Sequence, residues 1–297
     1  MSIRLSIVGY GNLGKSLERE IEKQGEMQLE AIYSRRQLDH AKYRPLEDIG
    51  KYDDCDVALI ALGSYSDVLQ YASYYSRLDT VDSFDTHAKI AEYKAQLNAT
   101  KPERISIIST GWDPGLLSLI RGAFSVGADA CATLWGMGVS QGHSNALRTI
   151  HGVIDAVQFT KPKHDALELI RCGETNGEKL HERICYVACA KGEEERVRNE
   201  ITHMANYFAG YDTQVKFCDS AEIARLKEQT HHCGQVVTIG EGFETHSEVK
   251  LACNTDYTAK IMMCYAMAIP QLRADGYKGA LDVYDIPMKY IAQTKLI

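Results

Sequence analysis

The segment Ile3-Arg4-Leu5-Ser6-Ile7-Val8-Gly9-Tyr10-Gly11-Asn12-Leu13-Gly14 decides the fold of this 297-residue chain. Its first six residues have the pattern of a short strand, and residues 15–23 predict a helix. The glycines between them form G-x-G-x-x-G in the strand–turn–helix context that predicts a dinucleotide-binding turn. The first-turn amides of such a helix face phosphate charge. We therefore expect the cofactor to contact this turn, at Gly9, Gly11, Asn12, Leu13 and Gly14.

The second predicted strand, residues 29–33, is followed by Ser34-Arg35-Arg36. A site for NAD would place a carboxylate here to accept hydrogen bonds from the ribose 2′-hydroxyl. Two guanidinium groups and a hydroxyl suit a 2′-phosphate instead. A solvated basic turn is the alternative. Because this position is one βαβ step after the glycine turn, the sequence favours NADP, with its 2′-phosphate on Ser34, Arg35 and Arg36.

Strands and helices alternate along the chain up to about Thr110. Apolar runs at 56–61, around 80–81 and at 104–108 predict buried strands, and helices are expected at 67–75, 86–97 and 115–123. This alternation predicts a doubly wound, Rossmann-type parallel sheet. Ligands of such sheets bind beyond the carboxyl ends of the strands. Gly63 and Ser64 lie at such an end, and they complete the predicted cofactor site.

The pattern changes beyond about Thr110. The remaining segments predict an α+β domain with an open mixed or antiparallel sheet. Its strands are expected at 131–135, 153–160, 181–189, 215–217 and 235–239, a glycine-rich loop at 136–144, and helices at 145–150 and from the charged run 192–195 to about Phe208. We expect a dinucleotide-binding domain of residues 1–113, completed by 253–297, and a second domain of residues 114–252. A helix at 257–272 is apolar nearly all round and is expected to be buried or to form an oligomer contact.

Composition excludes several other classes of protein. A net charge of −7 with 45% hydrophobic and 25% charged residues suggests neither a nucleic-acid nor an anionic-membrane partner. The nine cysteines are odd in number and scattered, without C-x-x-C, which indicates a reducing compartment and no zinc site. The chain enters a strand at its third residue and has no apolar run of membrane-spanning length. We therefore expect a soluble, cytoplasmic protein without a signal peptide and without a bound metal.

Two acids follow strands of the predicted parallel sheet. Asp85 lies in Asp82-Ser83-Phe84-Asp85-Thr86-His87, and Asp113 lies in Ser109-Thr110-Gly111-Trp112-Asp113-Pro114-Gly115. Each could cap the helix that follows it, which is the commoner role of a single strand-end aspartate. Two such acids on neighbouring loops, with Trp112 beside one of them, favour a site for a cationic or amine-bearing substrate.

Arg183 lies on the inward face of its predicted strand, together with Cys185, Val187 and Cys189. A buried unpaired charge is costly, so this arginine needs a partner. An acidic side chain could pair with it, or a strand end could let its head reach water. The third possibility is a substrate carboxylate bound in bidentate fashion. The spacing alone leaves all three open.

Taken together, these residues resemble the meso-diaminopimelate dehydrogenase family over nearly the whole chain. The glycine turn and Ser34-Arg35-Arg36 contribute to the resemblance, but their patterns are general ones. The more specific segments are Ser109-Thr110-Gly111-Trp112-Asp113-Pro114-Gly115 and Ser140-Gln141-Gly142-His143-Ser144. Further matches are Val81-Asp82 with Asp85 and His87, Trp135-Gly136, Val157-Gln158 with Thr160, and Asn254 with Asp256.

This resemblance implies NADP-dependent, reversible oxidative deamination at the D-centre of meso-2,6-diaminopimelate, a reaction of the lysine and diaminopimelate pathway. The products would be L-2-amino-6-oxopimelate, ammonia and NADPH. Asp85, Trp112 and Asp113 would surround the D-centre amine, with either aspartate as the base. Trp135 is implied to bind the substrate as well. Gln141 and Gly142 would contact the D-centre carboxylate, Thr160, Arg183 and His232 the distal carboxylate, and Asn254 the distal amino group. The family also implies a homodimer formed through the second domain.

One position departs from the family pattern. Cys233 stands where the family usually has a glycine, so His231 remains an alternative to His232. Two other functions are considered: another two-domain NADP-dependent reductase, such as a dihydrodipicolinate reductase or a sugar oxidoreductase, and a catalytically silent NADPH-binding regulator. The Glu-Lys-Pro and His-His-x-x-Lys-x-Asp motifs of the first group are absent. A regulator would not need the two strand-end acids together with Arg183.

Overall fold

The computed structural model describes residues 2–52, 55–64, 67–228 and 232–292. The chain divides into two compact units, one of residues 1–119 with 255–297 and the other of residues 120–254. The sequence predicted divisions after residues 113 and 252. The predicted fold class, a doubly wound parallel sheet with a second α+β domain, is confirmed.

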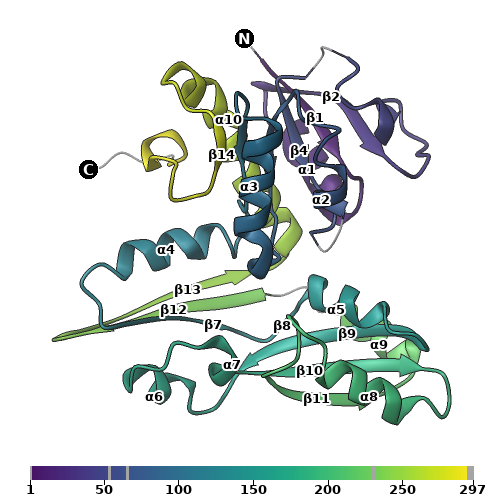
Figure 1. Ribbon diagram of the computed structural model, residues 1–297, viewed down its shortest axis with the longest axis vertical. Helices are drawn as coiled ribbons and strands as arrows, with labels where there is room; N and C mark the ends of the chain where they lie inside the picture. The colour runs from purple at the N-terminus through teal and green to yellow at the C-terminus, as the bar shows by residue number, and fades with distance from the viewer. Residues whose placement is uncertain (1, 53–54, 65–66, 229–231, 293–297) are drawn as a thin grey trace. The chain divides into compact units, whose positions relative to one another are not determined.

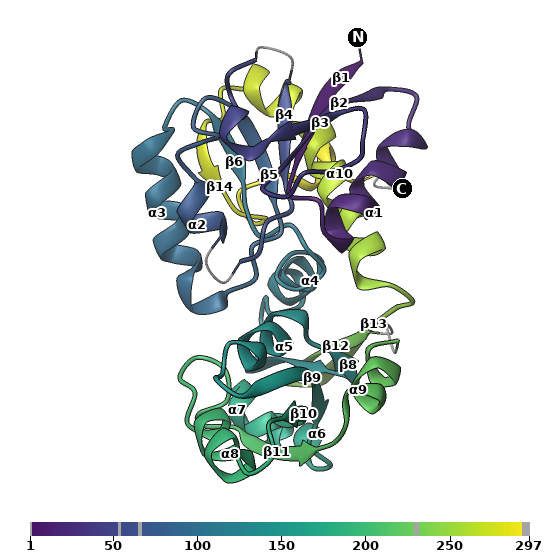
Figure 2. The same ribbon diagram turned by 90° about the vertical axis from the view of Figure 1, so that its right-hand side faces the viewer.

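Seven strands of the described residues form the sheet of the first unit, with every neighbouring pair parallel. Their order is β14 (Gly279–Leu281), β6 (Ile105–Ile107), β5 (Asp79–Asp82), β4 (Val57–Ile60), β1 (Ile3–Val8), β2 (Met27–Ser34) and β3 (Tyr43–Pro45). Four of these strands are labelled in Figure 1 and all seven in Figure 2. The chain builds outward from β1 in one direction and then from β4 in the other. The switch point between β1 and β4 is where such sheets bind nucleotides.

Helices cover both faces of this sheet, which is why every residue of its strands β4, β5 and β6 is buried. On one face, α1 (Asn12–Glu22) and α10 (Asn254–Ala274) pack in a core that contains Leu17 and Met262. On the other, α2 (Asp67–Tyr71) and α3 (Ile90–Thr100) pack in a core that contains Val68 and Leu97. Figure 2 shows the two pairs on opposite sides of the strands. The helix predicted at 257–272 is therefore largely buried as part of α10, although its Met267 is 40% exposed.

The second unit contains two sheets. The first has the order β11 (Asp212–Phe217), β10 (His181–Cys189), β9 (Val153–Pro162) and β8 (Gly138–Val139). The second has the order β13 (Phe243–Leu251), β12 (His232–Gly240) and β7 (Ala130–Trp135), with antiparallel pairs. β10 and β11 are parallel, because α8 (Glu194–Thr202) forms a crossover between them. This parallel pair makes the four-stranded sheet mixed.

Several predicted boundaries were wrong. The glycine-rich loop expected at 136–144 contains β8, and α5 (Gln141–Arg148) begins inside it because Ser140 takes the N-cap position and Gly142 is accommodated in the first turn. The helix expected at 67–75 ends at Tyr71. β13 was not predicted, because its alternating residues are polar and largely exposed. The remaining elements are α4 (Leu116–Phe124), α6 (Ala166–Arg171), α7 (Gly177–Leu180), α9 (Ser220–Lys227) and short 3₁₀ turns at 46–48, 87–89 and 288–290. Among the described residues, no helix has the length and apolar character needed to cross a membrane.

Candidate functional site

The glycine turn after β1 has the geometry that the sequence predicts. Gly9 has a φ of +98°, and a Cβ atom there would lie 2.6 Å from the carbonyl oxygen of Ala61. A Cβ atom at Gly14 would overlap the carbonyl oxygen of Gly9, so only glycine lets α1 pack this closely on the turn. Gly11 and Asn12 are exposed where α1 begins. The first-turn amides of α1, including those of Asn12 and Leu13, have no acceptor within the helix, as a phosphate site requires.

The basic end of β2 lies next to this turn. Arg36 donates a hydrogen bond from Nη2 to the carbonyl oxygen of Tyr10 in the turn (3.3 Å), and its backbone N–H donates to Ser34 Oγ (3.1 Å). Arg35 forms an ion pair with Asp67 of α2, with Nη2 2.6 Å from Oδ2. The Arg35 side chain is 53% exposed. Because an exposed pair of this kind contributes only about 0–1 kcal/mol, Arg35 remains available to a phosphate.

Gly63 and Ser64 follow β4, on the other side of the switch point. A Cβ atom at Gly63 would lie 3.7 Å from Asp67 Oδ2, which places Gly63 beside the ion pair of Arg35. Ser64 Oγ accepts a hydrogen bond from the backbone N–H of Asp85 (3.2 Å), and the Thr86 hydroxyl donates to the Ser64 carbonyl (3.1 Å). Ser64, a predicted cofactor residue, is therefore hydrogen-bonded to the loop that carries Asp85, one of the predicted catalytic acids.

The carboxylate of Asp85 is exposed and does not cap the following helix. Thr86 takes the N-cap position of the 3₁₀ turn at 87–89, and Lys89 that of α3. The capping role considered for Asp85 is thus wrong, because the helix begins later than the sequence suggests. This leaves the carboxylate available for a ligand.

The loop that carries Trp112 and Asp113 lies against the Asp85 loop. A Cβ atom at Gly111 would be 3.7 Å from Ser83 Cβ, so the two loops are in contact. Trp112 and Asp113 are both half-buried, and the Trp112 carbonyl accepts the backbone N–H of Leu117 (2.9 Å). The two predicted acids therefore project from adjacent loops at the carboxyl edge of the sheet.

In the second unit, Arg183 and Thr160 are direct cross-strand partners on β10 and β9. They are 6% and 9% exposed. The Arg183 guanidinium carbon lies 3.8 Å from the centre of the Tyr211 ring, a close cation–π contact. Within the described chain, Nε and Nη1 of Arg183 have no hydrogen-bond partner, and no carboxylate forms an ion pair with it. Burial lowers the pKa of this guanidinium.

Trp135 lies near the Tyr211 ring that contacts Arg183. Its backbone N–H donates to His181 Nε2 (2.9 Å), and the two rings are 4.8 Å apart. A Cβ atom at Gly177 would lie 3.4 Å from the Trp135 ring and 3.7 Å from the Tyr211 hydroxyl, which connects Trp135 to the ring under Arg183. Burial lowers the pKa of His181 to about 4, so the imidazole is neutral at pH 7 and its Nδ1 donates to the Gly177 carbonyl (2.9 Å).

His232 belongs to the same region of the second unit. Its Nε2 lies 2.6 Å from the carbonyl oxygen of Val139, and the preceding residue, Gly138, pairs with Thr160. His232 also pairs with Leu251, three residues before Asn254 begins α10. Gln141 and Gly142 begin α5 directly after β8. The alternative residue His231 lies outside the described residues.

Sequence reasoning missed four residues at these sites. Asp67 pairs with Arg35, Tyr211 stacks on Arg183, His181 holds the Trp135 backbone, and Asp82 binds both acid-bearing loops. None belongs to a local motif that indicates its role. Asp82 alone gave a signal, since it ends a buried strand.

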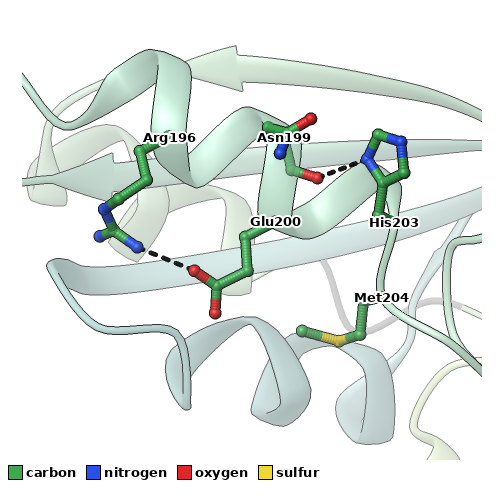
Figure 3. A pocket seen from close by; sticks show the side chains of 5 residues that line it. All are labelled: Arg196, Asn199, Glu200, His203 and Met204. Carbon is green, nitrogen blue, oxygen red and sulfur yellow. Dashed lines mark hydrogen bonds and ion pairs between the residues drawn. The ribbon is translucent and has the colours of Figure 1, made fainter.

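A hollow of about 430 Å³ on the surface of α8 is a weaker candidate. Figure 3 shows its lining residues, Arg196, Asn199, Glu200, His203 and Met204. The charged and polar groups satisfy one another, since Arg196 pairs with Glu200 (2.8 Å) and His203 Nδ1 donates to the Asn199 carbonyl (2.8 Å). None of these residues was predicted to be functional. Among the described residues, no group of three or more His, Cys, Asp or Glu side chains could hold a metal ion.

A family model and several known proteins are similar to this chain. A family model described as the diaminopimelic acid dehydrogenase C-terminal domain matches residues 111–257. The chain is 38% identical over 300 residues to the meso-diaminopimelate D-dehydrogenase of Corynebacterium glutamicum, covering 96% of this chain and 94% of that one. It is likewise 38% identical over 306 residues to the enzyme of the same name from Ureibacillus thermosphaericus, with the same coverage.

Two solved structures share the fold throughout. The C. glutamicum DAP dehydrogenase in complex with DAP has a TM-score of 0.89 and 37% identity, covering 99% of this chain and 97% of that one. An engineered D-amino acid dehydrogenase bound to NADP⁺ has a TM-score of 0.88 and 35% identity, covering 100% and 98%.

Proposed function

This chain belongs to the meso-diaminopimelate D-dehydrogenase family, and we propose that it oxidatively deaminates the D-centre of meso-2,6-diaminopimelate with NADP⁺, reversibly. The products are L-2-amino-6-oxopimelate, ammonia and NADPH. The observation that carries this proposal is that one chain has two strand-end acids and a buried arginine without an acidic partner among the described residues. A substrate with an amine at one end and a carboxylate at the other can pair its amine with the two acids and its carboxylate with the arginine.

The residues of the first unit fit NADP. The turn at Gly9 and Gly14 leaves the first-turn amides of α1 exposed to a pyrophosphate. Arg35 and Arg36 lie at the end of β2, where an NAD site would have an acid, and the hydroxyl of the preceding Ser34 accepts the Arg36 backbone N–H. When bound, NADP⁺ supplies the acceptor for the hydride of the D-centre carbon. The chain's part is to hold it with its 2′-phosphate on these arginines.

We propose that Asp85 and Asp113 bind the D-centre ammonium beside Trp112. One carboxylate removes a proton from the ammonium, directly or through a water molecule. After the carbon loses its hydride, the same carboxylates stabilise the cationic iminium. Water then adds to the carbon, and ammonia leaves to give the ketone. The adjacent loops keep both acids at one end of the substrate.

The second unit provides the groups that bind substrate carboxylates and the distal amine. We propose that Arg183 and Thr160, direct cross-strand partners, hold the distal carboxylate together with His232. The unpartnered Nε and Nη1 atoms of Arg183 suit a bidentate carboxylate. The remaining proposed contacts are Gln141 and Gly142 at the D-centre carboxylate, Trp135 along the substrate chain, and Asn254 at the distal amino group. Fixing the distal centre leaves one face of the D-centre open to hydride transfer, which selects the meso diastereomer.

We also propose a cytoplasmic homodimer that acts in lysine and diaminopimelate metabolism. The nine cysteines are odd in number and scattered along the chain without C-x-x-C, as in a reducing compartment. The exposed edge strand β13 gives the second unit a surface on which a partner subunit can pair. Light scattering coupled to size-exclusion chromatography tests the dimer.

The decisive experiment follows the absorbance of the reduced cofactor with a panel of substrates. The purified protein and NADP⁺ are mixed with meso-, L,L- or D,D-diaminopimelate, or with simple D-amino acids. We expect reduction with the meso compound, none with the L,L compound, and slower reduction with the D,D compound because its distal centre is inverted. NAD⁺ in place of NADP⁺ is the cofactor control. No reduction with any diastereomer, despite NADPH binding, would identify a silent NADPH-binding protein instead.

A further inference from the structure

Asp82, the last residue of β5, is bound to both loops that carry the proposed catalytic acids. Its Oδ1 accepts hydrogen bonds from the backbone N–H of Phe84 (2.9 Å) and of Ser109 (3.0 Å). Phe84 precedes Asp85, and Ser109 begins the loop that leads to Trp112 and Asp113. One carboxylate oxygen thus joins two loops that follow different strands.

Other contacts of Asp82 strengthen this connection. Its backbone carbonyl accepts both the N–H (2.9 Å) and the hydroxyl (2.8 Å) of Thr110. Its Oδ2 accepts the hydroxyl of Tyr93 on α3 (2.8 Å). Ser109 has a φ of +58°, a conformation that a serine seldom adopts unless its surroundings fix it. The Asp82 carboxylate binds the amide at that position.

Burying Asp82 is costly for the fold. It is 1% exposed and forms no ion pair within the described chain, since the nearby Lys101 ammonium donates to the Leu78 carbonyl and the Thr80 hydroxyl. Burial raises the pKa of the Asp82 carboxyl group. An apolar residue would suit this position better if only packing mattered. Unlike an apolar side chain, the carboxyl group provides hydrogen-bond acceptors in the positions that the two loops require.

We propose that Asp82 is a positioning residue for the deamination, which fixes the Asp85 loop against the loop of Trp112 and Asp113. This inference rests on the proposed function, because it assigns both loops to the amine end of the substrate. Ser64 holds the Asp85 loop from the side of β4, and Gly111 touches Ser83. Asp82 supplies the hydrogen bonds that set the distance between the two loops.

The consequence is a requirement for geometry at the reacting centre. Two acids that share one ammonium must both stay within hydrogen-bond reach of it. A misplacement of about 1 Å in such a site can lower the rate roughly 100-fold. Ser64 is the proposed cofactor residue that is hydrogen-bonded to the Asp85 loop, whereas the NADP-binding residues on β1 and β2 are held by other contacts. Loss of Asp82 should therefore change cofactor affinity little.

Three variants separate positioning from stability. Asp82→Ala removes the acceptor, and we expect kcat to fall roughly 10- to 100-fold with an unchanged KM for NADP⁺. Asp82→Asn keeps Oδ1 for the two amides and can donate to Tyr93, so it should restore kcat to within about threefold of wild type. Tyr93→Phe is the matched control, because it removes a hydrogen bond to the same carboxylate but keeps the aromatic ring that packs on Phe84 of the Asp85 loop (centroids 4.6 Å apart). It should leave kcat within about twofold of wild type.

A deuterium label at the D-centre carbon gives a readout that a purely structural role would not change. In Asp82→Ala the primary isotope effect on kcat should increase, because hydride transfer becomes more rate-limiting. Unchanged kcat in Asp82→Ala, or an Asp82→Asn variant as impaired as Asp82→Ala, would overturn the proposal. Asp82→Leu replaces Asp82→Ala if the latter does not fold, and failure of both to fold assigns Asp82 to stability alone and also overturns it.

Amide hydrogen exchange tests, without any turnover, whether Asp82 holds the two loops together. In Asp82→Ala, or in Asp82→Leu, peptides covering residues 83–87 and 109–113 should exchange faster, while those of β1 should not change. Equal protection in wild type and variant contradicts the inference. A wild-type protein that does not oxidise meso-diaminopimelate would instead refute the proposed function, and the exchange data would still decide whether Asp82 joins the loops.

Discussion

Replacing Arg183 by methionine is expected to have opposite effects on stability and on substrate binding. Arg183 is 6% exposed and, among the described residues, has no carboxylate partner. Its contact with Tyr211 offsets only part of the cost of burying a charge. Methionine has a similar length and can lie on the same ring without a charge. The folded state therefore no longer bears the free-energy cost of burying a charge. The proposed carboxylate site, in turn, loses its cation.

The magnitudes follow from the burial. Removing an uncompensated buried charge in favour of an apolar side chain should leave the free energy of unfolding unchanged or raise it by about 1–2 kcal/mol. Truncating one partner of a buried charge pair costs about 2–5 kcal/mol of binding. This corresponds to a loss of affinity for diaminopimelate of about 30- to 4,000-fold. Binding of NADPH should not change, because the nucleotide residues are in the first unit.

Two measurements check this prediction. Calorimetric titration of meso-diaminopimelate into the enzyme–NADPH complex gives the substrate affinity without turnover, and urea unfolding gives the stability. Lys161→Met is the matched control, because Lys161 pairs with Glu182 next to the Thr160–Arg183 pair but on the opposite, exposed face. It should alter neither quantity appreciably. An affinity change of less than about threefold in Arg183→Met, or a loss of several kcal/mol of stability, would refute the reasoning.

Three further variants test the other assignments. Arg35→Ala with Arg36→Ala should raise the KM for NADP⁺ roughly tenfold or more while leaving that for NAD⁺ nearly unchanged, because charge-assisted bonds to the 2′-phosphate are lost; equal effects in steady-state kinetics would contradict this. Asp113→Asn should lower kcat roughly 10²- to 10⁴-fold if Asp113 is the base, with unchanged NADPH binding by fluorescence titration; near-normal turnover would transfer the role to Asp85. His181, whose pKa burial lowers from 6.5 to about 4, stays neutral in the folded state while the unfolded state takes up a proton. The free energy of unfolding should therefore fall as the pH drops from about 6.5 to about 4, by on the order of 3 kcal/mol, and urea titrations of wild type and His181→Gln should differ in this slope.

The dinucleotide half of the site could be predicted because its determinants are local. The turn from Gly9 to Gly14 occupies six consecutive residues, and the two arginines follow β2 directly. Steric requirements at these positions, such as the overlap that a Cβ atom at Gly14 would cause, act within one βα unit. The alternation of apolar strands and helices is likewise visible along the chain. Boundaries were less predictable where polar and small residues dominate, as in β13 and α5.

The partners of the predicted residues depended on register and on contacts between distant segments. Thr160 lies opposite Arg183 because β9 and β10 pair in one of several possible antiparallel registers. Tyr211 reaches Arg183 from the chain that follows α8, and Asp82 reaches Ser109 from a neighbouring strand. The spacing left three possibilities open for Arg183: an acidic side chain, a strand end that reaches water, and a substrate carboxylate. The packing around the guanidinium excludes the first two for the described residues.

The sequence by itself determined the nucleotide-binding turn, the preference for a 2′-phosphate and the family, because these depend on side chains that are close together along the chain. Only the tertiary structure decided that Asp85 caps no helix, that Arg183 is buried without an acidic partner among the described residues, and that Asp82 joins two loops. The physical reason is that burial and hydrogen-bond satisfaction belong to the packed chain. Neither the burial of a residue nor its hydrogen-bond partners are defined until segments far apart in the sequence have packed together.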